Sequence, residues 1–333
     1  MNSLAPACDL FGMFVSGLEM SRRFYQEKVR PVVGVPHSAG LLGRGSEVLG
    51  FDDEMSTDHN WEPRALLFVR EGVTLEPDVP DEFEGRPCLV EVHTLRSYYQ
   101  KQLGFDPGQE LAVRDWLTFP EHFLRMQTAG GVFHDDIGLQ AVRDRLNYYP
   151  TDVWRYLLIA AWWRVHPEMN LVGRSGYVGD ELGSAVMGAQ LVHDLMQLCF
   201  LMEREYAPYR KWFGTAFSRL ACGPSVGPLL REVLRAETWQ EREAALMAAY
   251  QALGELHNKL EITPPIELGV ERMCGRPFKV VWSDFPGAIA AGIEDPEVKR
   301  IAERWPVGGI DQVREVLWGR GNGRRELVEL LDS

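Results

Sequence analysis

The sequence lacks the features that mark several large classes of protein. It has five cysteines in 333 residues and no CxxC pair, so neither a disulfide framework nor a paired-cysteine zinc site is expected. No run of about 18 uncharged apolar residues occurs, and the N-terminal segment meets Asp9 without a basic region, so we expect no membrane-spanning helix and no signal peptide. Internal repeats and low-complexity segments are absent too. Together these absences favour a globular protein of the reducing cytoplasm with no membrane partner.

Positive charge is also scarce in this chain. It has 35 Lys and Arg against 48 Asp and Glu, which gives a net charge of −13. A surface this acidic repels phosphate backbones, so we expect no nucleic-acid partner and favour a small-molecule substrate. The acidity can also serve solubility alone. Tryptophan, in contrast, is frequent, with ten residues. Most of them are expected in the core, and the alternative for some is the wall of a pocket that receives flat rings.

The first ~110 residues have the pattern of a small α/β unit. A helix is expected over residues 14–30, ended by Pro31. Three short apolar segments follow, and we predict strands in 40–44, 61–69 and 88–95. In the third strand the residues alternate, with Leu89, Glu91, His93 and Leu95 on one face and Val90, Val92 and Thr94 on the other.

Helices dominate the remainder of the chain. Long apolar helices are expected over 180–205 and over 239–260, the second opened by a capping box of Thr238 and Glu241. One late strand is predicted at 278–282. The chain is therefore expected to be α+β, with an α/β domain over residues 1–125 and a mainly helical domain over 126–333.

The segment GRGSEVLGFDDEMSTDHNWEPR, residues 43–64, carries the pattern most relevant to chemistry. A strand ends at Gly45-Ser46, where the missing Cβ of Gly45 lets a phosphate approach the backbone N–H groups. The Ser46 hydroxyl can bond a phosphate oxygen, and a helix starting near Glu47 would direct its positive end at the anion. This turn predicts a site for the phosphates of a nucleoside triphosphate.

Acidic and amide side chains after this turn predict a metal site. Asp58 and Asn60 stand at positions i and i+2, which share a face when the backbone is extended. Glu91 lies on a later strand and can approach from the side. Oxygen ligands of this kind suit Mg²⁺ or Mn²⁺, and such ions stabilise charge on attacking and leaving oxygens. We therefore expect Asp58, Asn60 and Glu91 to bind the metal, with Asp58 and Glu91 as catalytic residues.

This order of motifs resembles the DNA-polymerase-β-like nucleotidyltransferase superfamily. The superfamily pattern is a hydrophobic residue, Gly-Ser or Gly-Gly, a spacer, Asp-x-Asp/Glu and a third acid on a later strand, which Leu42–Ser46, Asp58 and Glu91 match in order. More narrowly, the chain is similar to a bacterial family of unknown function that is labelled nucleotidyltransferase-like. The stretches that carry this similarity are GSEVLGFDDEMSTDHNWEPR, GGVFHDDIG, NYYPTDVWRYLL, GDELGSAVMGAQLVHDLMQLCFLMEREYAPYRKWFGTAF and RPFKVV.

The resemblance implies a mixed sheet with flanking helices, followed by a helical domain that closes over the nucleotide. It does not supply an activity. From the site residues themselves we expect Mg²⁺-dependent transfer of a nucleoside monophosphate, from ATP or another nucleoside triphosphate, to a small-molecule hydroxyl. The sequence departs from the superfamily at Asn60, where an acid is expected. An amide adds no negative charge, so a nucleotide-binding sensor or accessory protein without turnover is the alternative. The acceptor, the preferred base and the oligomeric state stay open.

Two residues of the helical part are candidates for the same site. Glu181 opens a long helix, where capping is the default role of an acid, and the alternative is a general base or substrate contact. Lys211 stands in a basic turn, which is either solvated or reaches the triphosphate as a cofactor-binding cation. His59, His93 and His134 show no HxxH spacing, so hydrogen-bonding roles are favoured over zinc binding. Asp135 and Asp136 are expected to form a turn rather than a second metal site.

Overall fold

The computed structural model describes residues 14–58, 61–281, 283–304 and 306–313, with Asp58 described through its backbone. The chain divides into two compact units. The first combines Met1–Ala112 with Glu121–Tyr148, and the second combines Val113–Pro120 with Tyr149–Ser333.

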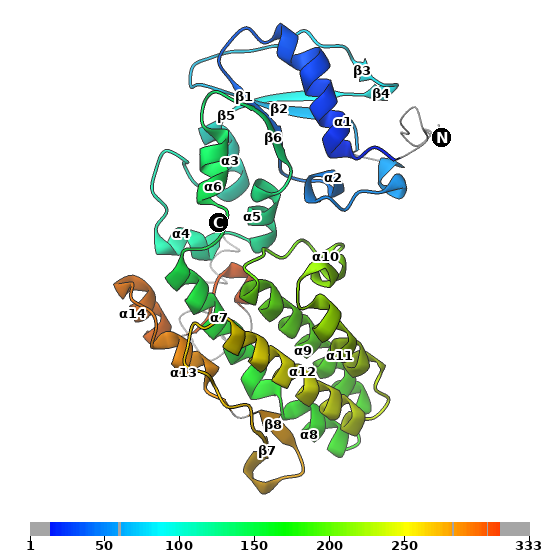
Figure 1. Cartoon of the computed structure of the whole chain (residues 1–333), viewed down its shortest axis with the longest axis vertical. Coiled ribbons are helices and arrows are strands. Elements are labelled where there is room, and N and C mark those ends of the chain that lie inside the picture. Colours follow the sequence, from blue (N-terminus) through cyan, green and yellow to red (C-terminus); the bar gives the residue numbers. More distant parts are fainter. Residues whose placement is uncertain (1–13, 59–60, 282, 305, 314–333) are drawn as a thin grey trace, which may run out of the picture. The chain divides into compact units, whose positions relative to one another are not determined.

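The first unit is built on a four-stranded mixed sheet (Figure 1). Its strand order is β5-β2-β1-β6, with bounds β1 Ser38–Leu41, β2 Arg64–Val69, β5 Leu89–Thr94 and β6 Gly131–Asp135. β1 runs antiparallel to β2 and to β6, whereas β2 and β5 are parallel. A two-stranded ribbon, β3 Glu82–Phe83 and β4 Arg86–Pro87, stands apart from this sheet.

Helices of the first unit surround this sheet. Their bounds are α1 Gly17–Phe24, α2 Ser46–Leu49, α3 Leu95–Leu103, α5 Glu121–Thr128 and α6 Leu139–Arg145. The remaining turns are the π-helix η1 Tyr25–Val29 and the 3-10 helices η2 Arg30–Val32 and η3 Glu54–Asp58.

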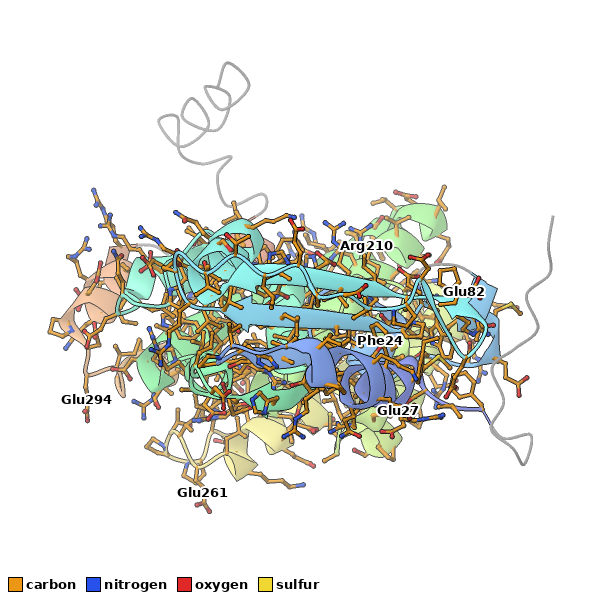
Figure 2. All side chains as sticks on the ribbon, turned by 90° about the horizontal axis from the view of Figure 1, so that it is seen from above. Phe24, Glu27, Glu82, Arg210, Glu261 and Glu294 are labelled. Carbon is orange, nitrogen blue, oxygen red and sulfur yellow. The ribbon has the colours of Figure 1, made fainter. Side chains whose placement is uncertain are left out.

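One face of the sheet is covered by α1 and η1 (Figure 1). α1 begins where the Ser16 hydroxyl accepts a hydrogen bond from the Glu19 N–H. Met20 and Phe24 then pack on Ala39, Ala65 and Leu67 of the sheet in a buried cluster. Figure 2 shows the resulting contrast, since Phe24 lies inside while Glu27, on the next turn, is exposed.

The prediction of an N-terminal α/β unit followed by a helical region is confirmed in its class and order. The boundary differs from residue 125, because β6 and α6 continue the first unit up to Tyr148. No strand was expected at residues 131–135, and the structure adds β6 there, directly before the turn that was expected at Asp135 and Asp136. The reason is that β6 completes the sheet by pairing with β1, some ninety residues earlier in the chain.

The second unit is mainly helical. Its helices are α4 Val113–Thr118, α7 Thr151–Val165, α8 Leu171–Tyr177, α9 Glu181–Met202, α10 Phe213–Arg219, α11 Gly223–Arg235, α12 Trp239–Lys259, α13 Phe285–Ala290 and α14 Pro296–Arg304. Short 3-10 turns are η4 His166–Glu168, η5 Met273–Gly275 and η6 Ile310–Gln312, and a hairpin joins β7 Val270–Arg272 to β8 Lys279–Val281. The predicted late strand at 278–282 corresponds to β8, and the predicted capping box of Thr238 and Glu241 is confirmed at the start of α12.

α9 is long and apolar enough to cross a membrane when judged by length and composition alone. Its apolar window is 56% buried within the protein, where it packs against α7, α8, α11 and α12. A buried core helix meets the same criterion, so this helix gives weak evidence for a membrane.

The buried imidazole of His257 makes the second unit sensitive to acid. His257 is fully buried on α12, where its Nε2 pairs with the Thr263 hydroxyl at 3.1 Å. Burial lowers the pKa of His257 from 6.5 to about 4. Between these values the unfolded chain binds more protons than the folded chain, so stability falls as the pH drops through this window. We expect His257 to account for a loss of up to about 3 kcal/mol in the free energy of unfolding.

Urea unfolding of wild type and His257→Gln at several pH values between 7 and 4 measures this contribution. The glutamine is neutral throughout, so the variant should lose less stability on acidification than wild type does. If the free energy of unfolding falls equally steeply with pH in the two proteins, His257 is not the group whose protonation destabilises the fold.

Candidate functional site

The face of the sheet opposite to α1 carries polar side chains of β2 and β5. In the parallel pairing, Leu66 of β2 stands beside Glu91 of β5. Because side chains alternate along a strand, Arg64 and Leu66 share this face with Glu91 and His93, whereas Leu67 and Val92 face the α1 core. The predicted alternation of the third strand is thereby confirmed from Leu89 to Thr94, whereas Leu95 already begins α3. It places Glu91 at a solvent-accessible face of the sheet.

A pocket of about 300 Å³ opens on this face. It lies between the ends of β1 and β2, the middle of β5, and helices α3 and α5. Its lining residues are Leu42, Gly43, Arg44, Arg64, Leu66, Glu91, His93, Tyr98, Lys101, Gln102 and Phe123. The volume stands at the lower end of the range for small-molecule sites.

The lining is cationic in a chain that is strongly acidic overall. Arg44, Arg64 and Lys101 contribute three positive charges, while Glu91 is the carboxylate of the lining. Arg64 is largely buried, with 17% of its side chain exposed, and it donates to the Arg44 carbonyl at 2.8 Å. Its Nε is buried without a hydrogen-bond partner among the described residues. An anionic ligand would therefore be attracted here and would find N–H donors.

Glu47 holds Arg64 in place from beneath the pocket. Its carboxylate is buried, 3% exposed, and forms an ion pair with the Arg64 guanidinium. Burial raises the pKa of Glu47, and the neighbouring Arg64 charge opposes that rise. Since either partner would be left as a buried lone charge without the other, the pair fixes the position of Arg64.

Glu91 and His93 form a second polar pair in the pocket. They stand two residues apart on β5 and hence on one face, with His93 Nε2 and Glu91 Oε2 3.3 Å apart. A carboxylate beside an imidazole can bind a cation or accept a proton from a ligand hydroxyl.

Tyr98 supplies an apolar wall with one polar atom. It is 3% exposed on α3, and its ring meets Phe68 edge to face at 5.2 Å. Its hydroxyl makes no well-directed hydrogen bond with the described residues, although the Gln127 amide lies nearby. Burial raises the pKa of Tyr98, so the phenol stays protonated and can donate to a ligand.

The predicted metal ligands Asp58 and Asn60 belong to a loop that the structure describes in part. Asp58 is the last residue of η3, and Asn60, like His59, lies outside the described residues. The loop is anchored by Asp52, whose Oδ2 accepts hydrogen bonds from the Gly17 N–H at 2.7 Å and from Trp61 Nε1 at 2.9 Å. Asp52 thereby ties the start of α1 to the end of this loop.

Gly45 and Ser46 stand outside the lining of the pocket, at the start of the four-residue helix α2. Gly45 has φ +134°, and a Cβ at this position would overlap the Glu47 carboxylate. A phosphate placed against Gly45 would meet this negative charge. The turn residues that do line the pocket are Gly43 and Arg44. The phosphate contact of Gly45 and Ser46 stays a prediction, with the buried Glu47 as an obstacle.

Comparison with known proteins identifies one family. Residues 116–213 match the family described as Domain of unknown function (DUF4037). This confirms the predicted resemblance to a family of unknown function. Of the described pocket residues, Phe123 falls within the DUF4037 match, so the candidate site lies mainly in the part of the chain that precedes it.

A solved structure gives a more distant similarity. It is the crystal structure of a nucleotidyltransferase-like protein from Exiguobacterium sibiricum 255-15, with 13% sequence identity and a TM-score of 0.33. The alignment covers 79% of this chain and 97% of that one. Similarity this low leaves the activity open. No curated protein matches the chain.

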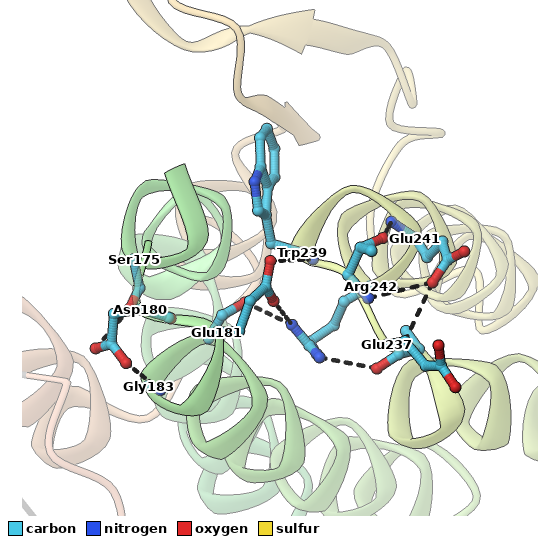
Figure 3. A network of polar contacts seen from close by, with 11 residues as sticks. Ser175, Asp180, Glu181, Gly183, Glu237, Trp239, Glu241 and Arg242 are labelled. Atoms are coloured by element: carbon cyan, nitrogen blue, oxygen red, sulfur yellow. Dashed lines mark hydrogen bonds and ion pairs between the residues drawn. The ribbon is translucent and has the colours of Figure 1, made fainter. Parts of the chain in front are cut away.

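Glu181 lies within the DUF4037 match and has a structural role in the second unit (Figure 3). Its carboxylate accepts hydrogen bonds from the Trp239 N–H at 3.1 Å and from Arg242 Nη1 at 3.3 Å. It thereby joins the start of α9 to the start of α12, while Asp180 caps α9 at the Gly183 N–H. These contacts account for an acid at position 181 without catalysis, and the predicted general-base role stays a prediction.

Lys211 is exposed in the turn before α10, also within the DUF4037 match. Its Nζ lies 4.6 Å from the centre of the Trp212 ring. This cation–π contact orients the side chain but does not indicate which ligand, if any, Lys211 binds. Its predicted role toward a triphosphate likewise stays a prediction.

Sequence reasoning found Glu91 but missed the cations around it. Arg44 and Arg64 belong to the segment that was singled out, yet they had no assigned role. The period of two along β2 would have placed Arg64 on the Glu91 face if β2 and β5 had been paired in register. Tyr98 and Lys101 carry a helical i, i+3 spacing directly after β5, which is a signal that could have been used.

Proposed function

We propose that the first unit binds a nucleoside triphosphate together with Mg²⁺ or Mn²⁺ and transfers its nucleoside monophosphate to a small-molecule hydroxyl. The observation that carries this proposal is the pocket that Arg44, Arg64 and Lys101 line together with Glu91. Cations are expected around phosphates, and a carboxylate among them is expected where a divalent metal accompanies those phosphates.

The donor set fits the metal that the fold family implies. Glu91 is a carboxylate on a rigid strand, and Asp58 and Asn60 are oxygen donors on the loop that leads into the neighbouring strand. Mg²⁺ commonly binds one or two protein carboxylates and takes its other ligands from substrate phosphates and water. When bound, the ion neutralises charge on the phosphates and on the departing pyrophosphate.

The chain's own residues then bind and orient the nucleotide and deprotonate the acceptor hydroxyl. Arg64, held by Glu47, and Lys101 attract phosphate oxygens, and the protonated Tyr98 hydroxyl donates to a ligand oxygen. Phe123 and Leu66 offer apolar surface to a nucleobase. The Glu91–His93 pair accepts the proton of the acceptor hydroxyl, which attacks the α-phosphorus as pyrophosphate leaves. The acidic surface outside the pocket favours a small acceptor over a nucleic acid.

A second function is favoured by one specific residue. Asn60 replaces the acid of the superfamily pattern, so the metal site holds two negative charges where three are expected. A weakened site supports nucleotide binding, with most of the metal arriving on the nucleotide, and need not support turnover. The same pocket would then serve a nucleotide sensor or accessory protein.

Calorimetric titration with ATP and with adenosine, both in the presence of Mg²⁺, tests the proposed pocket. We expect Lys101→Met to weaken ATP binding about 10-fold, because it removes a charge beside the phosphates, and to leave adenosine binding unchanged. ATP should also raise the melting temperature of wild type in proportion to its affinity.

Two further variants locate the effect. Lys28→Met removes an exposed lysine from η1 of the same unit and should leave the affinity for both ATP and adenosine unchanged. Lys211→Ala examines the cation predicted from the second unit. If Lys101→Met binds ATP as tightly as wild type does, or loses equal affinity for ATP and for adenosine, the phosphates do not bind in this pocket.

A further inference from the structure

A second group of metal-binding side chains lies at the β1–β6 edge of the first unit. In the antiparallel ladder Ser38 stands opposite Asp135, and the ladder continues by one step, since the Asp136 N–H donates to the His37 carbonyl at 3.1 Å. His37 and Asp136 are therefore cross-strand neighbours. His134 precedes Asp136 by two residues and shares its face.

The side chains of these three residues converge. A ring nitrogen of each histidine and a carboxylate oxygen of Asp136 lie within 4.8 Å of one another. His134 Nε2 is 2.8 Å from Asp136 Oδ2, and the two imidazole rings are 4.8 Å apart between centroids. Two imidazoles and one carboxylate are a donor set that suits divalent first-row transition metals better than Mg²⁺.

The contacts of His37 show which tautomer its neutral ring adopts. Its Nδ1 lies 2.9 Å from the Val35 carbonyl oxygen, which can only accept a hydrogen bond, so Nδ1 carries a proton. The neutral ring then presents an Nε2 lone pair. A backbone carbonyl that binds the other ring N–H is the usual support of a metal-ligating histidine, because it fixes both the tautomer and the orientation of the ring.

The Tyr25 hydroxyl shares this site. It lies 2.9 Å from His37 Nε2 and hence donates to the lone pair. Tyr25 begins the π-helix η1, an element that occurs often at functional sites. A metal on His37 replaces this hydrogen bond, as it replaces the one between His134 and Asp136.

This cluster is separate from the candidate nucleotide pocket. His37 and His134 are on the face of the sheet that carries Ala39 and the α1 core, because His134 pairs with Ala39 in the ladder. Glu91 is on the opposite face. Asp136 also lines a different pocket of about 600 Å³ with Val69, Thr94 and Gly138, so the cluster is open to solvent and to exchange of a metal.

We propose that His37, His134 and Asp136 bind one divalent transition-metal ion, such as Zn²⁺, and that water completes its coordination. The proposal does not depend on the nucleotidyl transfer proposed above. It reverses the expectation that Asp135 and Asp136 only form a turn. Asp135 does so, since it accepts hydrogen bonds from the N–H groups of Gly138, Leu139 and Gln140, whereas Asp136 joins the histidines.

Titration of the full chain with Co²⁺, without nucleotide, tests the site. Co²⁺ substitutes for Zn²⁺ and gives visible absorption bands that report on its ligands. We expect one Co²⁺ per chain, displaced by Zn²⁺ but not by millimolar Mg²⁺. His134→Ala and Asp136→Asn should each weaken Co²⁺ binding by more than about 100-fold, because losing a ligand costs more than the 10–100-fold of a supporting contact. Both residues are accessible, so the fold should persist, which circular dichroism checks.

The matched control is His193→Gln. His193 lies 3.4 Å from the Asp194 carboxylate and is a histidine–carboxylate pair without the second imidazole, so its loss should leave Co²⁺ binding unchanged. Tyr25→Phe removes the hydroxyl that competes for His37 Nε2 and should leave Co²⁺ affinity equal or higher. The proposal is overturned if wild type shows no Co²⁺ bands, or if His134→Ala and Asp136→Asn bind Co²⁺ as tightly as wild type.

Discussion

Glu91→Gln is expected to reduce Mg²⁺-dependent release of pyrophosphate from ATP by about 1,000-fold. The change is nearly isosteric and removes one negative charge from β5, at the centre of the cationic pocket. Glu91 is half-buried and its polar contact is His93, so the sheet should tolerate the amide. The loss arises because the carboxylate has two proposed tasks, holding the metal and accepting the proton of the acceptor.

The assay measures labelled pyrophosphate from ATP with a panel of small hydroxyl acceptors. Glu76→Gln, an exposed acid of the same unit, is the matched control and should release pyrophosphate at the wild-type rate. Asn60→Asp should act in the opposite direction to Glu91→Gln, since it restores the missing charge and tightens metal binding. Turnover that survives in Glu91→Gln would exclude this residue from the reaction.

The alternative function, nucleotide binding without transfer, predicts a different result in the same experiment. If Asn60→Asp tightens Mn²⁺ or Mg²⁺ binding in the presence of ATP, yet no acceptor supports pyrophosphate release, the pocket binds nucleotide without transfer. Failure of both variants to alter metal–nucleotide binding would place the metal elsewhere.

The strands that carry local alternation were predictable from the sequence. Glu91 and His93 fall on one face and Val90 and Val92 on the other, because a strand with one buried face must alternate apolar and polar residues. The capping box of Thr238 and Glu241 was equally predictable, since its hydrogen bonds connect residues three apart. Both signals are contained in a few consecutive residues.

β6 was not predictable in the same way. Gly130, Gly131, Asp135 and Asp136 are typical turn residues, and the strand between them exists because β1, far away in sequence, supplies its partner. The ladder also shifts register between Ala39 and Gly40, so no regular period marks the segment. His37 and Asp136 become neighbours only through this pairing, and therefore the second metal-binding cluster was invisible from the sequence.

The candidate pocket was predictable in part for a related reason. Glu91 was identified as an acid within an apolar strand. The cations that surround it come from the turn after β1, from β2 and from α3, and no local pattern brings these three segments together. The Gly45–Ser46 turn shows the same limit from the other side, because the motif alone gives no sign that the buried carboxylate of Glu47 lies next to Gly45.

The pairing of β6 with β1 leads to the second large effect, which is on stability. Gly130→Ala is expected to lower the free energy of unfolding by about 3 kcal/mol or more. Gly130 has φ +71° and donates its N–H to the Val48 carbonyl at 2.8 Å, directly before β6 begins. A Cβ there would overlap the Leu41 carbonyl oxygen at the end of β1 and would lie 3.2 Å from Val48 Cγ1. Backbone cannot yield as a flexible side chain does, so β6 must move away from β1.

Gly104→Ala separates this overlap from the cost of the left-handed backbone. Gly104 has φ +76° at the end of α3, and a Cβ there would have no atom within 4 Å. Gly104→Ala should lower the free energy of unfolding by only about 1 kcal/mol, the penalty of an alanine at positive φ. Urea unfolding of both variants measures the difference, and equal costs would show that β6 accommodates the methyl group. Because His134 and Asp136 stand on β6 and its extension, Gly130→Ala should also weaken Co²⁺ binding, whereas Gly104→Ala should preserve it.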